Sequence, residues 1–166
     1  IYKALDHIGD KTLSLGLVDG RNIWRNDIDA SLKLAEKAIQ KLGNDRVMIA
    51  PSCSLLHSPV DLENEKGFDA ELRSWMAFAR QKLTEVVLIT KGLNIGEDAI
   101  AKEIADSNAV QTSRKSSQRI NNKTVKENAS KITPAMMERK SPFSARQKIQ
   151  RSALNLPVFH TTSIGS

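Results

Sequence analysis

Hydrophobic and polar positions alternate over residues 12–19, and this period of two is typical of a β-strand with one buried face. The apolar members of the alternation are Leu13, Leu15 and Leu17. Over residues 27–42 the pattern becomes helical, with one apolar face formed by Ile28, Leu32, Ala35, Ile39 and Leu42. Asn26 or Asp27 is the expected N-cap and Gly43 follows the last turn, so we predict one amphipathic helix here.

A second short apolar run, residues 47–50, ends at Pro51. Strand, helix and strand within about forty residues form the pattern of a βαβ unit, whose two strands are parallel. Polar residues that follow such strands gather at one edge of the sheet, where ligands usually bind. The candidate site residues are therefore those of two turns: Asp19, Arg21, Asn22 and Trp24 after the first strand, and Ser52, Cys53, Ser54 and His57 after the second.

Further along, Asp69 has the features of an N-cap for the longest helix, which we predict to run to about Lys91 and to end at Gly92. An apolar stripe along it is expected to pack on the sheet, and its members are Leu72, Trp75, Met76, Ala79, Leu83, Val86, Val87 and Thr90. A short helix is predicted over residues 97–105. Residues 107–133 lack a clean period and are predicted to form an extended crossing or a mobile linker.

Two prolines, at positions 134 and 142, each follow a Ser or Thr, a pattern typical of an N-cap followed by proline at the first helical position. The second predicts a basic helix from Pro142 to about Leu154. Residues 156–166 are predicted to form a strand that runs into a glycine turn. Because the chain begins with Ile1 and stops directly after that turn, we expect it to be part of a longer protein.

Charge is distributed unevenly along the chain. Residues 101–151 hold twelve basic and four acidic side chains, a net charge of +8 in a chain whose total is +6. A basic segment can bind nucleic acid, but this one has only Phe143 as an aromatic, which favours a solvated linker on an acidic surface. The single cysteine suits a reducing compartment, and no signal peptide or membrane-length apolar run occurs. We therefore expect a cytoplasmic protein without nucleic-acid or membrane partners.

Two clusters in the predicted turns have a structural and a functional interpretation. Cys53 and His57 are four residues apart, but a zinc site needs three or four ligands, so a small buried thiol and a hydrogen-bonded histidine are favoured over a metal site. Asp19 and Arg21 predict either a salt bridge within the turn or a ligand contact, since a guanidinium suits carboxylates and phosphates. Gly165 permits either a tight turn or a close approach of the backbone to a ligand.

Four runs of residues resemble cobalamin-independent methionine synthase. They are residues 15–25 (LGLVDGRNIWR), residues 50–57 with 59–61 (APSCSLLH and PVD), residues 72–79 (LRSWMAFA) and residues 156–166 (LPVFHTTSIGS). The similarity covers almost the whole chain in the right order. The family is built from two βα barrels joined by a long linker.

The resemblance implies an α/β fold class: a partial TIM-type βα barrel followed by a mostly helical or irregular linker. Residues 1–95 correspond to the last two βα units of the N-terminal barrel, and residues 96–155 to the inter-barrel linker. Residues 156–166 correspond to the first strand of the C-terminal, catalytic barrel. Because two βα units leave an open sheet edge, we expect the fragment alone to self-associate, whereas the parent enzyme is expected to be a monomer.

The resemblance also implies a chemistry: transfer of a methyl group from methyltetrahydropteroyl-triglutamate to the sulfur of L-homocysteine, which gives L-methionine without cobalamin. Zinc in such enzymes binds the thiol and lowers its pKa. This favours the thiolate, which is the nucleophile. The family's Ile-Gly-Ser motif, which contacts homocysteine or methionine, falls on Ile164, Gly165 and Ser166. The zinc ligands of the family lie beyond Ser166, so we expect no catalytic residue and no metal ligand in this fragment.

Cys53 holds a place in the N-terminal barrel similar to that of a zinc-binding cysteine in the C-terminal barrel. We interpret it as a relic of duplication without partner ligands, and we expect this fragment alone to be inactive. The competing interpretations are a basic interaction or nucleic-acid-binding module and a small metalloprotein that uses Cys53 and His57. Salt dependence separates the first of these from the methyltransferase fragment, because nucleic-acid affinity falls steeply with salt through counterion release.

Overall fold

The computed structural model describes residues 5–155, 157–159 and 161. The chain divides into two compact units between Asn121 and Asn122. The first unit is of mixed α/β type, and the second is helical where the structure describes it. Among the described residues, none of the helices is long and apolar enough to cross a membrane.

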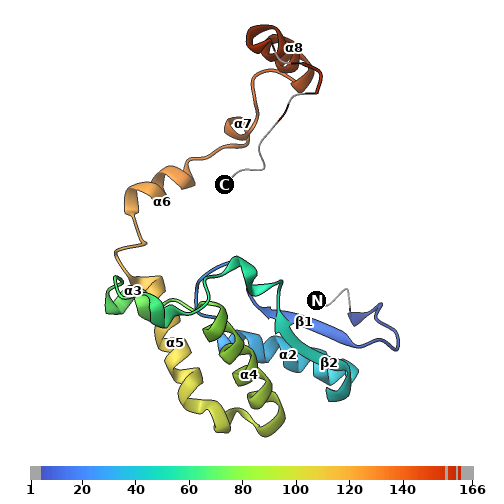
Figure 1. Cartoon of the computed structure of the whole chain (residues 1–166), viewed down its shortest axis with the longest axis vertical. Helices are drawn as coiled ribbons and strands as arrows, with labels where there is room; N and C mark the ends of the chain where they lie inside the picture. The colour runs from blue at the N-terminus through green and yellow to red at the C-terminus, as the bar shows by residue number, and fades with distance from the viewer. Residues whose placement is uncertain (1–4, 156, 160, 162–166) are drawn as a thin grey trace. The chain divides into compact units, whose positions relative to one another are not determined.

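The first unit is built on two parallel strands, β1 (Leu13–Val18) and β2 (Val47–Pro51), joined through helix α2 (Ile28–Leu42) (Figure 1). Leu13 pairs with Val47, and the register is regular until an irregularity after Gly16. The predicted βαβ unit is therefore confirmed, with its strand and helix boundaries close to those expected.

The ends of α2 are closed by local bonds, as the sequence predicted. The Asp27 side chain accepts a hydrogen bond from the Ala30 amide at 3.0 Å, which satisfies one of the free N–H groups of the first turn. Gly43 has a φ of +83°, and its amide donates to the Ile39 carbonyl at 2.8 Å. This left-handed region favours glycine, so the helix ends here.

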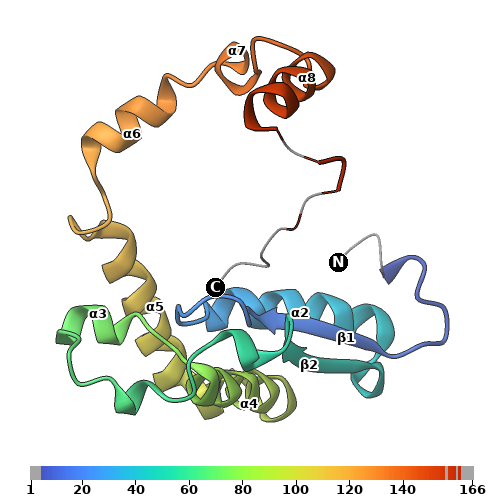
Figure 2. The same ribbon diagram turned by 45° about the horizontal axis from the view of Figure 1, so that its top comes forward.

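The core of the first unit lies where α2 and α4 (Ala79–Ile95) pack against each other and against the strands (Figure 2). It is formed by Val18, Ile28, Leu32, Ile89 and Ile100, each exposed by no more than 2%. A second hydrophobic cluster is formed by Leu5, Leu15, Ala35 and Ala38. Burial of such side chains contributes roughly 1.5–3 kcal/mol each, so this seam between helices and sheet holds the unit together.

The single long helix predicted from Asp69 to Lys91 is wrong. The chain forms a short helix α3 (Ala70–Ser74), leaves helical structure at residues 75–78 and resumes as α4. The residues between the helices pair with the turn after β1: Met76 forms an antiparallel bridge with Trp24, and the Ala77 amide donates to the Ile23 carbonyl at 2.8 Å. These long-range backbone bonds replace the helical ones.

The buried face of α4 also differs from the predicted stripe. Leu83 and Val87 are 54% and 63% exposed, whereas Lys82, Glu85 and Ile89 are buried. Gly92 does not end the helix. It lies inside it, where a Cβ atom would come within 2.7 Å of the Ile100 side chain, so its missing side chain allows close packing.

Beyond α4, the predicted short helix and irregular linker are replaced by a longer helix. A 3-10 turn, η4 (Glu97–Ile100), leads into α5 (Ala101–Ser116), which packs on α2. Residues 107–116 lack an apolar period because α5 is held by polar contacts, described below. The rest of the predicted linker also contains a helix, α6 (Lys123–Ser130), capped by the Asn122 side chain.

The proline-led helices are confirmed as α7 (Pro134–Met137) and α8 (Phe143–Leu154), although Pro142 is the N-cap of α8 rather than its first helical residue. Short 3-10 turns complete the structure: η1 (Asn44–Arg46), η2 (Leu55–His57) and η3 (Leu62–Asn64). The predicted strand over residues 156–166 lies mostly outside the described residues.

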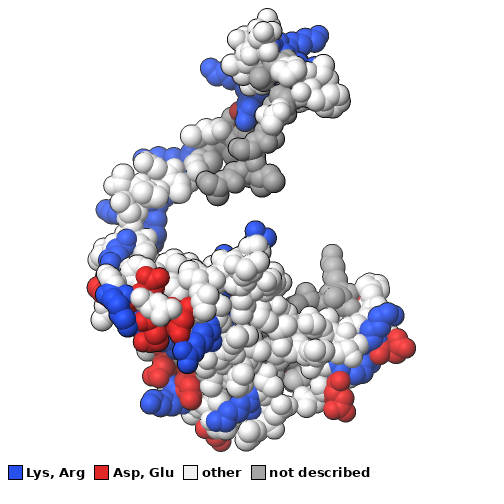
Figure 3. All heavy atoms as spheres, in the orientation of Figure 1, with Lys and Arg blue, Asp and Glu red and all other residues white. Residues whose placement is uncertain are grey.

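Basic side chains are spread over the described helices of the second unit among uncharged surface (Figure 3).

In the first unit, the Arg119 guanidinium forms two ion pairs, with Nη1 at 2.8 Å from Asp69 Oδ1 and 3.3 Å from Glu71 Oε2. The hydrogen bond from Arg119 is the largest cause that lowers the pKa of Asp69 to about 2, and the hydrogen bond from the Leu72 amide is the next. Such exposed pairs contribute little to stability.

Candidate functional site

The two polar turns that were predicted to meet do meet at the carboxyl ends of the strands. The Gly20 amide donates to Ser52 Oγ at 3.1 Å, and the Ser52 amide donates to the Val18 carbonyl at 2.8 Å. The backbones are so close that a Cβ atom on Gly20 would lie 2.7 Å from the Cys53 carbonyl oxygen. Only glycine permits this approach at position 20.

The Asp19 side chain stabilises the first turn through hydrogen bonds to the Arg21 amide and the Asn22 side chain, and not through the predicted salt bridge to the Arg21 side chain. Its Oδ1 accepts from the Arg21 amide at 2.8 Å, and its Oδ2 accepts from the Asn22 side chain at 2.7 Å. The Asn22 Oδ1 in turn accepts from the Trp24 amide at 3.0 Å. No ion pair joins Asp19 to the Arg21 side chain in the described part of the chain, so the predicted salt bridge within the turn is wrong.

Lys82, on the first turn of α4, was missed by the sequence reasoning because a charged residue on a helix is ordinarily expected to be exposed. Its side chain is 1% exposed, and Nζ donates to the Trp24 carbonyl at 3.1 Å and lies 3.4 Å from Asn22 Oδ1. Burial lowers the pKa of Lys82, while the charges of Glu85 and Asp19 act in the opposite direction. The amine therefore ties α4 to the turn after β1.

Glu85 lies one helical turn further along and was missed for the same reason. Its Oε1 accepts from the Asn26 amide at 2.9 Å, and the Asn26 side chain donates to Ser31 Oγ at 2.7 Å. Its Oε2 is buried without a hydrogen-bond partner among the described residues. Burial raises the pKa of Glu85, and the Asn26 bond and the charges of Lys82 and Arg25 reduce that effect.

Helix α5 closes the same turn from the other side. Ser107, which is fully buried, donates to the Asn26 carbonyl at 3.0 Å and accepts from the Ile28 amide at 3.3 Å. Gln111 Nε2 donates to the Arg25 carbonyl at 3.2 Å. The segment between β1 and α2 is thus fixed by side chains from α4 and α5.

Cys53 and His57 do not form a cluster with other metal-binding side chains. Cys53 is half-buried and its Sγ is 3.7 Å from the Ser54 carbonyl, while His57 is exposed at the end of η2. Ser54 Oγ accepts from the Leu56 amide at 3.3 Å and so caps η2. Within the described ranges, no three His, Cys, Asp or Glu side chains gather in a way that could hold a metal ion.

The predicted substrate-binding residues Ile164, Gly165 and Ser166 lie outside the described residues. What the structure defines is an α/β unit with a preorganised polar turn at the carboxyl ends of two parallel strands. Comparison with known proteins shows which family the chain is similar to.

The family model described as "Cobalamin-independent synthase, N-terminal domain" matches residues 2–43. A 5-methyltetrahydropteroyltriglutamate–homocysteine methyltransferase of Acidithiobacillus ferrooxidans is 52% identical over 161 residues, which is 97% of this chain and 20% of the relative. Enzymes with the same name from Coxiella burnetii and Parvibaculum lavamentivorans are each 48% identical over 157 residues, 95% of this chain and 20% or 21% of theirs. These matches confirm the resemblance to cobalamin-independent methionine synthase, over a segment that spans about a fifth of the curated relatives it matches.

The buried carboxyl of Glu85 gives a prediction for stability. Its pKa in the folded state is raised, so the folded state binds this proton more tightly than the unfolded chain. The favourable contribution of the Glu85 carboxyl to folding stability is therefore present below the pKa of this group in the unfolded chain. It is lost as pH rises through the pKa of the group in the folded state. Glu85→Gln keeps the acceptor for Asn26 and removes the charge, so we expect it to raise stability at neutral pH by about 1 kcal/mol and to have no effect near pH 4.

Thermal unfolding followed by circular dichroism between about pH 4 and about pH 8 measures this difference. Glu36→Gln, at an exposed position on α2, is the matched control and should show no pH-dependent gain. A Glu85→Gln variant whose advantage is the same at both ends of the range would contradict the assignment of a buried charge.

Proposed function

We propose that this chain is a working part of an enzyme that transfers a methyl group from methyltetrahydropteroyltriglutamate to L-homocysteine and forms L-methionine without cobalamin. The observation that carries the proposal is the 52% identity to a methyltransferase of that name over 97% of this chain. The single cysteine fits a reducing compartment, and we place the enzyme in the cytoplasm as a monomer.

The domain assignment follows the same resemblance. Residues 1–95 are proposed as the last two βα units of a TIM-type barrel, residues 96–155 as the segment that connects two barrels, and residues 156–166 as the first strand of the second. The parallel pairing of β1 and β2 supports the barrel, because all strands of such a barrel are parallel. The position of the polar turns at the carboxyl ends of the strands is also that of the ligand-binding face of such barrels.

Ile164, Gly165 and Ser166 are proposed to contact the amino-acid part of homocysteine. A glycine turn at the end of a strand can offer backbone groups and a hydroxyl to a carboxylate or an ammonium group. Bound zinc would supply a thiolate of lowered pKa. The described residues do not fit a zinc site, since Cys53 and His57 have no third ligand beside them, so we assign no step through zinc to this chain.

A chimeric enzyme tests the proposal. The aligned segment of the Acidithiobacillus ferrooxidans methyltransferase is replaced by this chain, and methionine formation is measured with both substrates and without cobalamin. We expect an active chimera and no methionine formation by this chain alone. A folded, monodisperse chimera that forms no methionine would overturn the proposed function.

Ser166→Ala in that chimera tests the site itself. Loss of one hydrogen bond to a charged substrate group should raise the KM for homocysteine about tenfold and leave the KM for the methyl-folate unchanged. Ser163→Ala, three residues earlier, is the matched control and should change neither KM. If Ser166→Ala leaves the homocysteine KM as it was, the assignment of this residue fails while the methyl transfer stands.

A further inference from the structure

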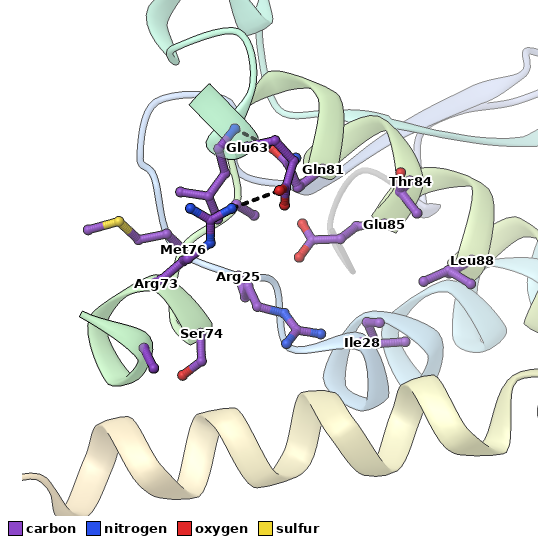
Figure 4. A pocket seen from close by; sticks show the side chains of 13 residues that line it. Arg25, Ile28, Glu63, Arg73, Ser74, Met76, Gln81, Thr84, Glu85 and Leu88 are labelled. Carbon is purple, nitrogen blue, oxygen red and sulfur yellow. Dashed lines mark hydrogen bonds and ion pairs between the residues drawn. The ribbon is translucent and has the colours of Figure 1, made fainter. Parts of the chain in front are cut away.

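A cavity of about 480 Å³ lies in the first unit between α3, the first turns of α4 and the start of α2 (Figure 4). It lies beside the turn that follows β1. Its walls combine aliphatic side chains with a few charged ones. The charged groups differ in whether they already have partners.

Glu85 supplies an anionic end to this cavity. The side chain is only 5% exposed, and Figure 4 shows its carboxylate pointing into the cavity from α4. Its Oε1 is bonded to the Asn26 amide, but Oε2 has no partner among the described residues. An unpaired buried carboxylate oxygen is unfavourable, and a donor that enters the cavity, above all an ammonium group, would satisfy it.

Arg25 supplies a cationic group in the same cavity. Its backbone is fully used, because its amide donates to the Trp75 carbonyl at 2.8 Å and its carbonyl accepts from Gln111. Its guanidinium has no hydrogen bond or ion pair within the described ranges, although the charge of Glu85 acts on it across the cavity. A free guanidinium is suited to a carboxylate, which it can bind with two parallel hydrogen bonds.

The second arginine of the cavity does not compete for this role. Arg73 is already paired, with Nη2 at 2.9 Å from Glu63 Oε2 and Nη1 donating to the Glu65 carbonyl. Among the described residues, the cavity therefore holds a carboxylate with one unpaired oxygen, Glu85, and a guanidinium without a partner, Arg25, and these two do not form an ion pair with each other. A molecule that carries both an ammonium group and a carboxylate would supply a partner for each of them.

Most of the remaining wall is apolar, and its polar members are Ser74, Gln81 and Thr84. Ile28, Leu62, Met76 and Leu88 line the cavity and would contact an aliphatic side chain. Pockets for small molecules typically combine such a surface with a few polar groups that fix orientation. Burial of the methylene groups of an aliphatic chain of four or five carbons against this surface would favour binding.

We propose that this cavity binds a small aliphatic α-amino acid, with its ammonium group on Glu85, its carboxylate on Arg25 and its side chain against the apolar wall. The proposal concerns an amino-acid site formed by residues other than Ile164, Gly165 and Ser166, and it does not depend on the methyl transfer. The unpaired Oε2 of Glu85 is the observation that points to a ligand, and the free guanidinium defines which kind.

The test uses L-leucine as the probe and titration of this chain followed by calorimetry and amide chemical shifts. We expect saturable binding, with shifts centred on residues 25–28 and 84–88. Isocaproate, which lacks the ammonium group, and isoamylamine, which lacks the carboxylate, should each bind at least tenfold more weakly to the unaltered protein. This comparison requires no variant, so it stands even if a substitution impairs folding.

Variants then assign the two ends of the ligand. Glu85→Gln should weaken L-leucine about tenfold or more and leave isocaproate unaffected, whereas Arg25→Gln should weaken L-leucine and leave isoamylamine unaffected. Glu36→Gln and Arg139→Gln, both at exposed positions, are the matched controls and should bind L-leucine as the unaltered chain does. Absence of saturable binding, equal affinity for the three compounds, or shifts centred on Ile164–Ser166 instead would each overturn the proposal.

Discussion

Replacement of Trp75 by alanine is expected to lower the free energy of unfolding by about 3–5 kcal/mol. The indole is 1% exposed and its Nε1 donates to Ser113 Oγ on α5 at 3.1 Å. Its carbonyl accepts from the Arg25 amide, so the same residue joins the break before α4 to the turn after β1. Alanine would leave a large cavity and an unpaired hydroxyl between elements that are far apart in the sequence.

Chemical denaturation followed by circular dichroism measures this loss. Trp75→Phe keeps most of the ring and removes the donor, so it should cost about 1 kcal/mol from the hydrogen bond plus a smaller packing loss. Leu83→Ala is the informative control, because a continuous helical stripe would bury Leu83 together with Trp75. Leu83 is 54% exposed in the structure, so its truncation should change stability by no more than about 0.5 kcal/mol. Equal losses at the two positions would contradict the break between α3 and α4.

The elements that could be predicted from the sequence are those whose causes are local. Strand β1 has a clean period of two, and α2 has a single apolar face closed by Asp27 and Gly43. Parallel pairing with β2 then follows from the length of the connection. Each of these features depends on residues that are neighbours in the chain, so the sequence alone is sufficient to predict it.

The break at residues 75–78 has a cause that is distant in the sequence. Trp75 and Met76 fit the predicted helical stripe, but the backbone groups of residues 75–77 pair with residues 23–25. A helical period cannot reveal a partner fifty residues away. The part of α5 beyond residue 105 was missed for a related reason, since Ser107 and Gln111 hold it by polar contacts that no apolar period reports.

The candidate site also combines features that the sequence predicts with features that it does not. The meeting of the turns at Gly20 and Ser52 followed from the βαβ pattern, whereas the buried side chains of Lys82 and Glu85 did not. Both are charged residues on a helix, where the ordinary expectation is exposure to solvent. The one available signal was their spacing of three residues, which places them on the same face of α4.

Gly16→Ala is expected to lower the free energy of unfolding by about 1–3 kcal/mol and to loosen the candidate site. A Cβ atom at this position would lie 2.7 Å from Ser52 Cα and 3.3 Å from the Ser52 amide nitrogen, so it would meet backbone that cannot rotate away. The end of β1 and the turn after β2 would have to separate. That movement would draw Ser52 Oγ away from the Gly20 amide, a bond of 3.1 Å that brings the two polar turns together.

Two measurements separate this effect from a general loss of stability. Amide hydrogen exchange should speed up at Gly20 and Ser52 in the Gly16→Ala variant more than at the core of α2, because the strain is applied where those two amides are bonded. Gly67→Ala is the matched control, since a Cβ atom there meets nothing within 4 Å and the φ angle is not in the left-handed region. The control should be neutral or stabilising by roughly 0.4–1 kcal/mol through the unfolded state. Uniform exchange changes across the first unit in the Gly16→Ala variant would show that the strand ends are not the point at which the turns are held together.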